Sequence, residues 1–82
     1  MAASFEDISR WVRRAKEEGC THLIVVCDTY DHDDYPVYVS KDEDIHERIE
    51  HFQKASMQRI MEVYKMSMDL DAQLKEHRAY NV

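Results

Sequence analysis

The sequence feature that most constrains the fold is a run of five consecutive apolar residues, Leu23-Ile24-Val25-Val26-Cys27. The run is too short and too rich in β-branched side chains for a helix, so it predicts a strand over Thr21–Cys27. Because successive side chains of a strand point to opposite faces, an unbroken apolar run has to be covered on both of them. We therefore expect Thr21–Cys27 to be the central strand of a sheet.

The segment before this strand predicts an amphipathic helix over Ser4–Glu18. Its apolar side chains recur at helical spacing: Phe5, Ile8, Trp11, Val12 and Ala15. Ser4 can cap the first turn, with Asp7 at the third helical position. Gly19 can adopt the left-handed conformation that ends a helix.

After the central strand, residues 28–35 predict an eight-residue loop, and Pro36–Val39 predicts a second strand with Val37 and Val39 on one face. Ser40 and Glu43 match the capping-box pattern, so we expect a second helix to open at Ser40. The buried stripe of that helix would be Ile45, Ile49 and Phe52.

Residues 57–68 fit both a helical stripe and the alternation of a strand. We favour a strand over Met57–Met66, because the central strand needs a neighbour on each side. A final helix over Leu70–Ala79, capped by Asp69, completes the order α-β-β-α-β-α. The prediction is one α/β (α+β) domain spanning residues 1–82, a two-layer fold with a three-stranded sheet.

An 82-residue chain buries only a little over half of its unfolded surface, so association would stabilise it. We therefore expect a homo-oligomer. Four methionines could contribute to that contact or fill the core: Met57, Met61, Met66 and Met68.

The negative charge is concentrated in one stretch of the chain. Residues 28–50 have a net charge of −7, whereas the whole chain has −6. A general affinity for nucleic acid needs a cationic surface, so this balance argues against it. No segment reaches the roughly 18 apolar residues that span a bilayer. With no basic and apolar leader at the start, and with Cys20 and Cys27 as reduced thiols, we expect a cytoplasmic protein.

The densest polar cluster directly follows the central strand: Asp28, Asp31, His32, Asp33 and Asp34. Three interpretations are open: a solvated loop, a surface for a cationic protein, or a divalent-cation site made of Asp28, Asp31, His32 and Asp34. A calcium-binding EF-hand loop is excluded. Counted from Asp31, Tyr35 and Pro36 stand where an oxygen ligand and a glycine belong.

Other chemistry is poorly supported, which favours a non-enzymatic protein. His46 and His51 are five residues apart, so on a helix they point roughly 140° away from one another and cannot share a zinc ion. Carboxylates around Cys27 would disfavour the thiolate that a nucleophile needs. A chain with one glycine has no glycine-rich phosphate loop.

Arg10, Arg13 and Arg14 lie three and four residues apart, on one side of the first predicted helix. Arginines so placed can bind phosphate, or they can simply form a solvated face. If they bind a nucleotide, we expect tyrosines to stack on its base, the candidates being Tyr30, Tyr35 and Tyr38.

The segment Thr21–Val39, together with Met57–Tyr64, resembles a group of short phage and prophage proteins without an established function. The resemblance implies a phage accessory protein in the host cytoplasm. Small acidic proteins of that kind often inhibit host defence enzymes or sequester their nucleotide signals. The resemblance assigns no site residue.

Three functions follow, in order of preference. The first is an anti-defence protein that presents its acidic loop and nearby tyrosines to a basic patch of a host protein. The second is a sponge that sequesters a nucleotide through Arg10, Arg13 and Arg14. The third is a hydrolase that depends on a divalent metal bound by the Asp28–Asp34 loop.

Overall fold

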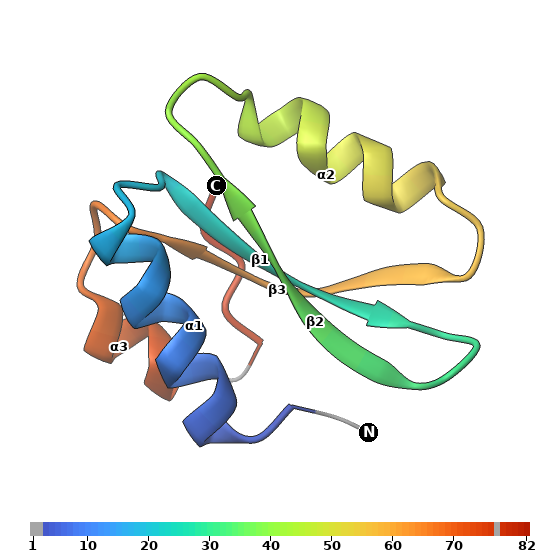
Figure 1. Ribbon diagram of the computed structural model, residues 1–82, viewed down its shortest axis with the longest axis horizontal. Coiled ribbons are helices and arrows are strands. Elements are labelled where there is room, and N and C mark those ends of the chain that lie inside the picture. Colours follow the sequence, from blue (N-terminus) through green and yellow to red (C-terminus); the bar gives the residue numbers. More distant parts are fainter. Residues whose placement is uncertain (1–2, 77) are drawn as a thin grey trace.

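A computed structural model describes residues 3–76 and 78–82, which form three helices and three strands (Figure 1). The elements are α1 (Phe5–Glu17), β1 (His22–Asp28), β2 (Asp33–Val39), α2 (Ile45–Lys54), β3 (Gln58–Lys65) and α3 (Leu70–Lys75). The predicted order and the α+β class are confirmed. The ambiguous segment after α2 is a strand, as we favoured.

β1 is the central strand of an antiparallel sheet with the order β2-β1-β3. The side chains of residues 23–26 are completely inaccessible to solvent, so both faces of this strand are covered. A register shift between Val25 and Val26 places a bulge opposite them in β3. The apolar run therefore takes the position that its pattern predicts.

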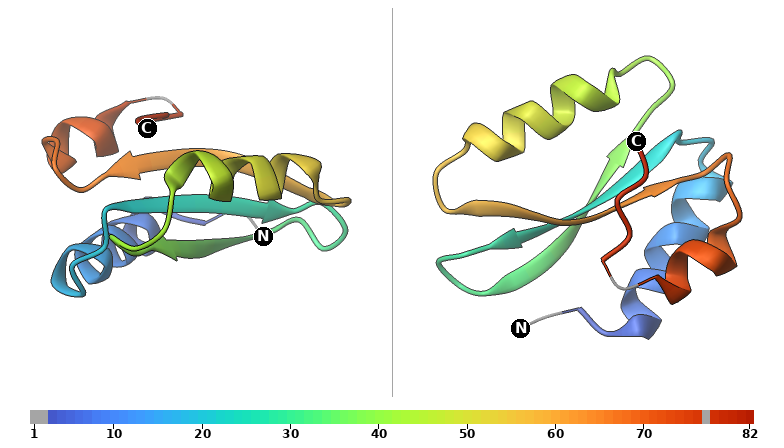
Figure 2. Two further views of the ribbon diagram at one scale, coloured as in Figure 1. Left: turned by 90° about the horizontal axis from the view of Figure 1, so that it is seen from above. Right: turned by 180° about the vertical axis from the view of Figure 1, so that it is seen from behind.

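Helices cover both faces of the sheet, so the domain has three layers and the expected two-layer arrangement is wrong. The apolar stripe of α2 (Ile45, Ile49, Phe52) packs with Ile24 and Val26 on one face. Val12 of α1 and Leu74 of α3 pack with Leu23 and Val25 on the other. Figure 2 shows α1 on the β2 side and α3 on the β3 side of that second face. The physical reason is the unbroken apolar run of β1. Its side chains point alternately to the two faces of the sheet, so both faces have to be covered by helices.

The ends of α1 are those that the sequence predicts. Ser4 caps the helix through a reciprocal pair of hydrogen bonds with Asp7. Gly19 has a φ of +74°, the left-handed conformation that a side chain would disfavour.

The second helix begins later than predicted, at Ile45, with Asp44 rather than Ser40 as its cap. Asp44 accepts a hydrogen bond from the His46 N–H at 2.9 Å. Ser40 and Glu43 do bond, but they close a separate turn in front of the helix. Asp44 stands directly before the buried Ile45, so burial of that side chain decides which cap is used.

The third helix ends at Lys75 instead of Ala79. Beyond it, the chain turns back and runs parallel to β3, where Val63 bonds to the backbones of Ala79 and Asn81. The buried Gln73 side chain accepts from the Lys65 N–H at 2.7 Å and donates to the Lys65 carbonyl at 2.8 Å. A side-chain amide thus bonds to β3 as a neighbouring strand would.

Two further expectations concern the cysteines and the membrane. Cys20 and Cys27 are free thiols, as predicted. Within residues 3–76 and 78–82, no helix combines the length and the apolar character needed to cross a bilayer.

Candidate functional site

The acidic segment is a tight hairpin turn, and the expected eight-residue loop is wrong. β2 begins at Asp33, so the turn comprises only residues 29–32. The Asp28 carbonyl accepts from the His32 N–H at 2.6 Å, and the Asp28 carboxylate accepts from the Tyr30 N–H at 2.9 Å. His32 closes the turn with a φ of 59°. Asp28 therefore organises the turn with both its main chain and its side chain.

Pairing of β1 with β2 brings the acidic residues into cross-strand contact. Asp28 lies opposite Asp33, and Cys27 lies opposite Asp34. Because neighbouring residues of a strand alternate, Asp28 and Asp33 lie on the face covered by α2, whereas Asp34 lies on the face covered by α1 and α3. We name the four aspartates together with Tyr30 the acidic hairpin end: Asp28, Tyr30, Asp31, Asp33 and Asp34.

Two segments that are distant in sequence touch the acidic hairpin end. The Thr29 N–H donates to the carbonyl of Met57, at 2.9 Å, in the connection between α2 and β3. The N–H of Ala3 donates to the Asp34 carboxylate at 3.0 Å. Met57 is 52 % exposed, so this bond places an accessible apolar side chain close to the turn. The sequence gives no local signal for either contact.

Carboxylates keep Cys27 in its thiol form. Partial burial raises the pKa of Cys27, and the neighbouring Asp34 and Asp28 raise it further. The Cys27 Sγ is 3.7 Å from the Asp28 carbonyl. Arg59 pairs with Cys27 from β3, so a row across the sheet contains Asp34, Cys27 and Arg59. A thiol with a raised pKa is a poor nucleophile, which agrees with the prediction for Cys27.

The acidic residues do not converge on a common point. In the described part of the chain, no group of three or more His, Cys, Asp and Glu side chains is arranged to hold a metal ion. The proposed ligand set of Asp28, Asp31, His32 and Asp34 is divided between the two strands and the turn.

The three candidate tyrosines lie in different places. Tyr30 is at the turn and is 73 % exposed. Tyr35 packs against the core on the α2 face, and Tyr38 packs on the opposite face. Burial raises the pKa of both of these phenols. Only Tyr30 therefore offers a large free ring at the acidic hairpin end.

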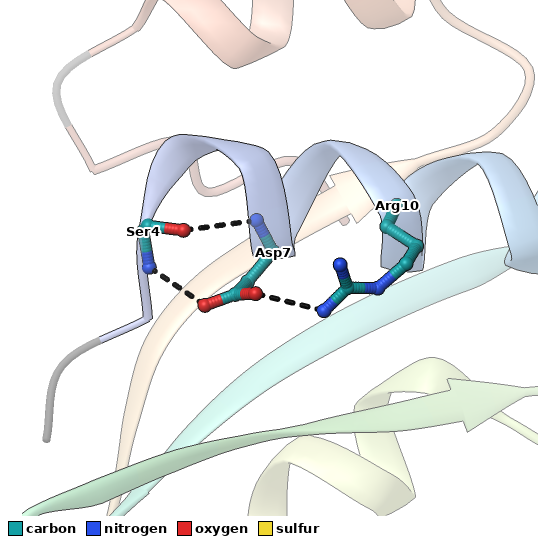
Figure 3. Close-up of polar contacts among 3 residues, drawn as sticks. All are labelled: Ser4, Asp7 and Arg10. Carbon is teal, nitrogen blue, oxygen red and sulfur yellow. Dashed lines mark hydrogen bonds and ion pairs between the residues drawn. The ribbon is translucent and has the colours of Figure 1, made fainter.

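The arginine cluster lies on the solvent side of α1, where Arg10, Arg13 and Arg14 line one shallow hollow. Glu17 and Glu18 line the same hollow. Arg14 lies 3.5 Å from Glu18, and Arg10 donates to the Asp7 carboxylate at 2.7 Å (Figure 3).

The Ser4 backbone and side chain, followed by Arg10, hold the pKa of Asp7 below its usual value. Asp7 thus engages Arg10 as an anion, and two of the three arginines already have carboxylate partners. The hollow carries both signs of charge. Burial raises the pKa of Tyr38, and the nearby charges of Arg14 and Arg10 lower it.

No protein-family model, curated protein sequence or solved structure matches this chain.

Proposed function

We propose that this protein is a small non-enzymatic interaction protein of the cytoplasm, which binds a basic surface patch of a partner protein through the acidic hairpin end. The observation that carries the proposal is the density of charge at one projecting turn. Four aspartates lie within seven residues, and Tyr30, the most exposed large hydrophobic residue in the described part of the chain, lies among them. An aromatic anchor surrounded by charge is a common arrangement at protein interfaces.

Electrostatics favour a cationic partner. Within residues 3–76 and 78–82, Asp28, Asp31 and Asp34 form no ion pair. Asp28 and Asp33 face one another across the strands, and like charges in such pairs repel. A cationic surface would relieve this repulsion and would also increase the rate of encounter.

The resemblance to short phage and prophage proteins supports a host protein as the partner, in particular a defence protein. A defence enzyme that acts on nucleic acid needs a cationic surface for its substrate. An acidic protein that covers such a surface would compete with the substrate. The proposed activity is therefore anti-defence inhibition by occupation of a basic site.

The proposal is tested by affinity capture from a lysate of the host, with captured proteins identified by mass spectrometry. The test variant is Asp31→Asn/Asp33→Asn/Asp34→Asn. The control is Asp42→Asn/Glu47→Gln/Glu76→Gln, which changes the net charge equally at exposed positions elsewhere. We expect the wild type and the control to capture the same basic protein, and the test variant to lose it. Equal capture by all three proteins would refute the proposal.

A nucleotide sponge is the second candidate, supported by the hollow that Arg10, Arg13 and Arg14 share. The carboxylates of Glu17 and Glu18 in the same hollow oppose an anionic ligand. A thermal-shift screen against nucleotides tests this function, because a ligand that binds only the folded state raises Tm. An increase that disappears in Arg13→Ala would favour the sponge over the protein-binding function.

A further inference from the structure

An apolar groove lies between α1 and α3 and is lined by none of the residues of the acidic hairpin end. Its volume is about 420 Å³. Phe5, Val12, Leu70 and Leu74 form its apolar lining, and Phe5 is 64 % exposed. Two helices that pack on the sheet through their inner sides thus leave an accessible apolar strip between their outer sides.

The rim of this groove carries two cations and two anions: Arg13, Lys16, Glu17 and Asp71. A balanced rim gives no preference for a strongly acidic or strongly basic partner. It does suit a contact between two identical surfaces, because two copies of a rim whose charges sum to zero do not repel one another. This balance distinguishes the groove from the acidic hairpin end, whose charged side chains are all aspartates.

We propose that the α1–α3 groove is the interface of a two-fold symmetric dimer, and that a second copy of this chain occupies it. The exposed Phe5 ring of each copy would enter the groove of the other. An antiparallel crossing of the two α1 helices centred on Ser9 places Phe5 of one copy near Arg13 of the other. Ser9 lines the groove, and its small side chain permits a close approach there.

The dimer is independent of the proposed function, because the groove and the acidic hairpin end share no residue. Association would also offset the limited burial that a chain of 82 residues can reach alone.

Sedimentation equilibrium measures the mass directly. We expect the wild type to sediment at twice the chain mass of 9.8 kDa. Phe5→Ser should raise the dissociation constant of the dimer at least about tenfold. Tyr30→Ser removes another exposed aromatic ring, at the acidic hairpin end, and should leave the constant unchanged. Circular dichroism verifies that both variants fold.

A cysteine at position 9 tests the geometry. Under mild oxidation, Ser9→Cys should form a covalent dimer, because the two thiols would face one another across the symmetry axis. Ser67→Cys introduces an exposed thiol elsewhere and should not crosslink above the level of the wild type, which already has Cys20 and Cys27.

Three results would overturn the proposal. One is a monomeric wild type at protein concentrations up to roughly 1 mM. Another is a dimer that Phe5→Ser leaves intact, because a different surface would then form the contact. The third is equal crosslinking of the Ser9→Cys and Ser67→Cys variants.

Discussion

The two ends of β1 differ in how they use their polar groups. At its start, His22 is 93 % buried, and the Gln73 side chain bonds to the backbone of Lys65 on the neighbouring strand. At its other end, Asp28 only shapes a turn, and Asp31 and Asp33 face solvent. We name the first region, with His22, Lys65 and Gln73, the closed end. The comparison teaches that His22 and Gln73 at the closed end are buried within the fold, whereas Tyr30, Asp31 and Asp33 at the hairpin end are exposed.

The largest effect on stability should come from Gln73→Ala. The change removes four hydrogen bonds, two with the Lys65 backbone, one to the Asp69 carbonyl and one from the Asn81 side chain, and leaves buried backbone groups without a partner. We expect the free energy of unfolding in urea to fall by about 2–3 kcal/mol. Gln53→Ala, at an exposed position of α2, should change it by less than about 0.5 kcal/mol. Similar losses for the two variants would remove the distinction between the closed end and the surface.

Acid should destabilise the protein through His22. Burial lowers the pKa of His22, the charges of Lys65 and His46 lower it further, and a backbone group of Val82 acts in the opposite direction. The unfolded chain, with a histidine pKa of about 6.5, therefore takes up the proton before the folded one. The contribution of His22 to stability is complete above about pH 6.5 and is lost as the pH falls towards its folded pKa.

Urea denaturation between about pH 7.5 and about pH 5 measures this effect. The free energy of unfolding of the wild type should fall over that range, and that of His22→Gln should fall less. Glu43, whose pKa is lowered chiefly by the Ser40 backbone, loses its contribution only below its own unfolded pKa, near 4.5. Parallel curves for the wild type and His22→Gln would show that the closed end does not hold a neutral histidine.

The smallest effect on stability should come from Asp31→Asn/Asp33→Asn/Asp34→Asn. Asparagine keeps an acceptor oxygen for the Ala3 N–H and removes the repulsion across the strands. We expect a change below about 0.5 kcal/mol in the free energy of unfolding. A loss comparable to that of Gln73→Ala would mean that the aspartates serve the fold, and the comparison between the two ends would fail.

Much of the fold follows from short-range patterns. The apolar run fixes β1 as the central strand, and capping residues set the starts of α1 and α3 at Ser4 and Asp69. The predicted start of the second helix was wrong because two residues in this segment could each cap a helix. Ser40 and Asp44 both resemble helix caps, and only burial of the following Ile45 selects Asp44.

The candidate site was predicted in part. The sequence locates the aspartates but not the conformation of the turn, because Asp33 and Asp34 are poor strand formers and pair here only because β1 extends to Asp28. The proximity of Met57 and Ala3 to the turn depends on tertiary contacts and has no local pattern. The prediction of two layers was wrong, even though the apolar run implied that both faces of the sheet are covered.

The most direct test of the central claim is the equilibrium dissociation constant for the captured partner, measured by titration calorimetry. The Asp31→Asn/Asp33→Asn/Asp34→Asn variant is compared with the Asp42→Asn/Glu47→Gln/Glu76→Gln control, which has the same net charge. We predict that the first binds at least about tenfold more weakly than the wild type and the second within about twofold. Equal weakening of both would show that net charge, and not the acidic hairpin end, governs binding and would contradict the account.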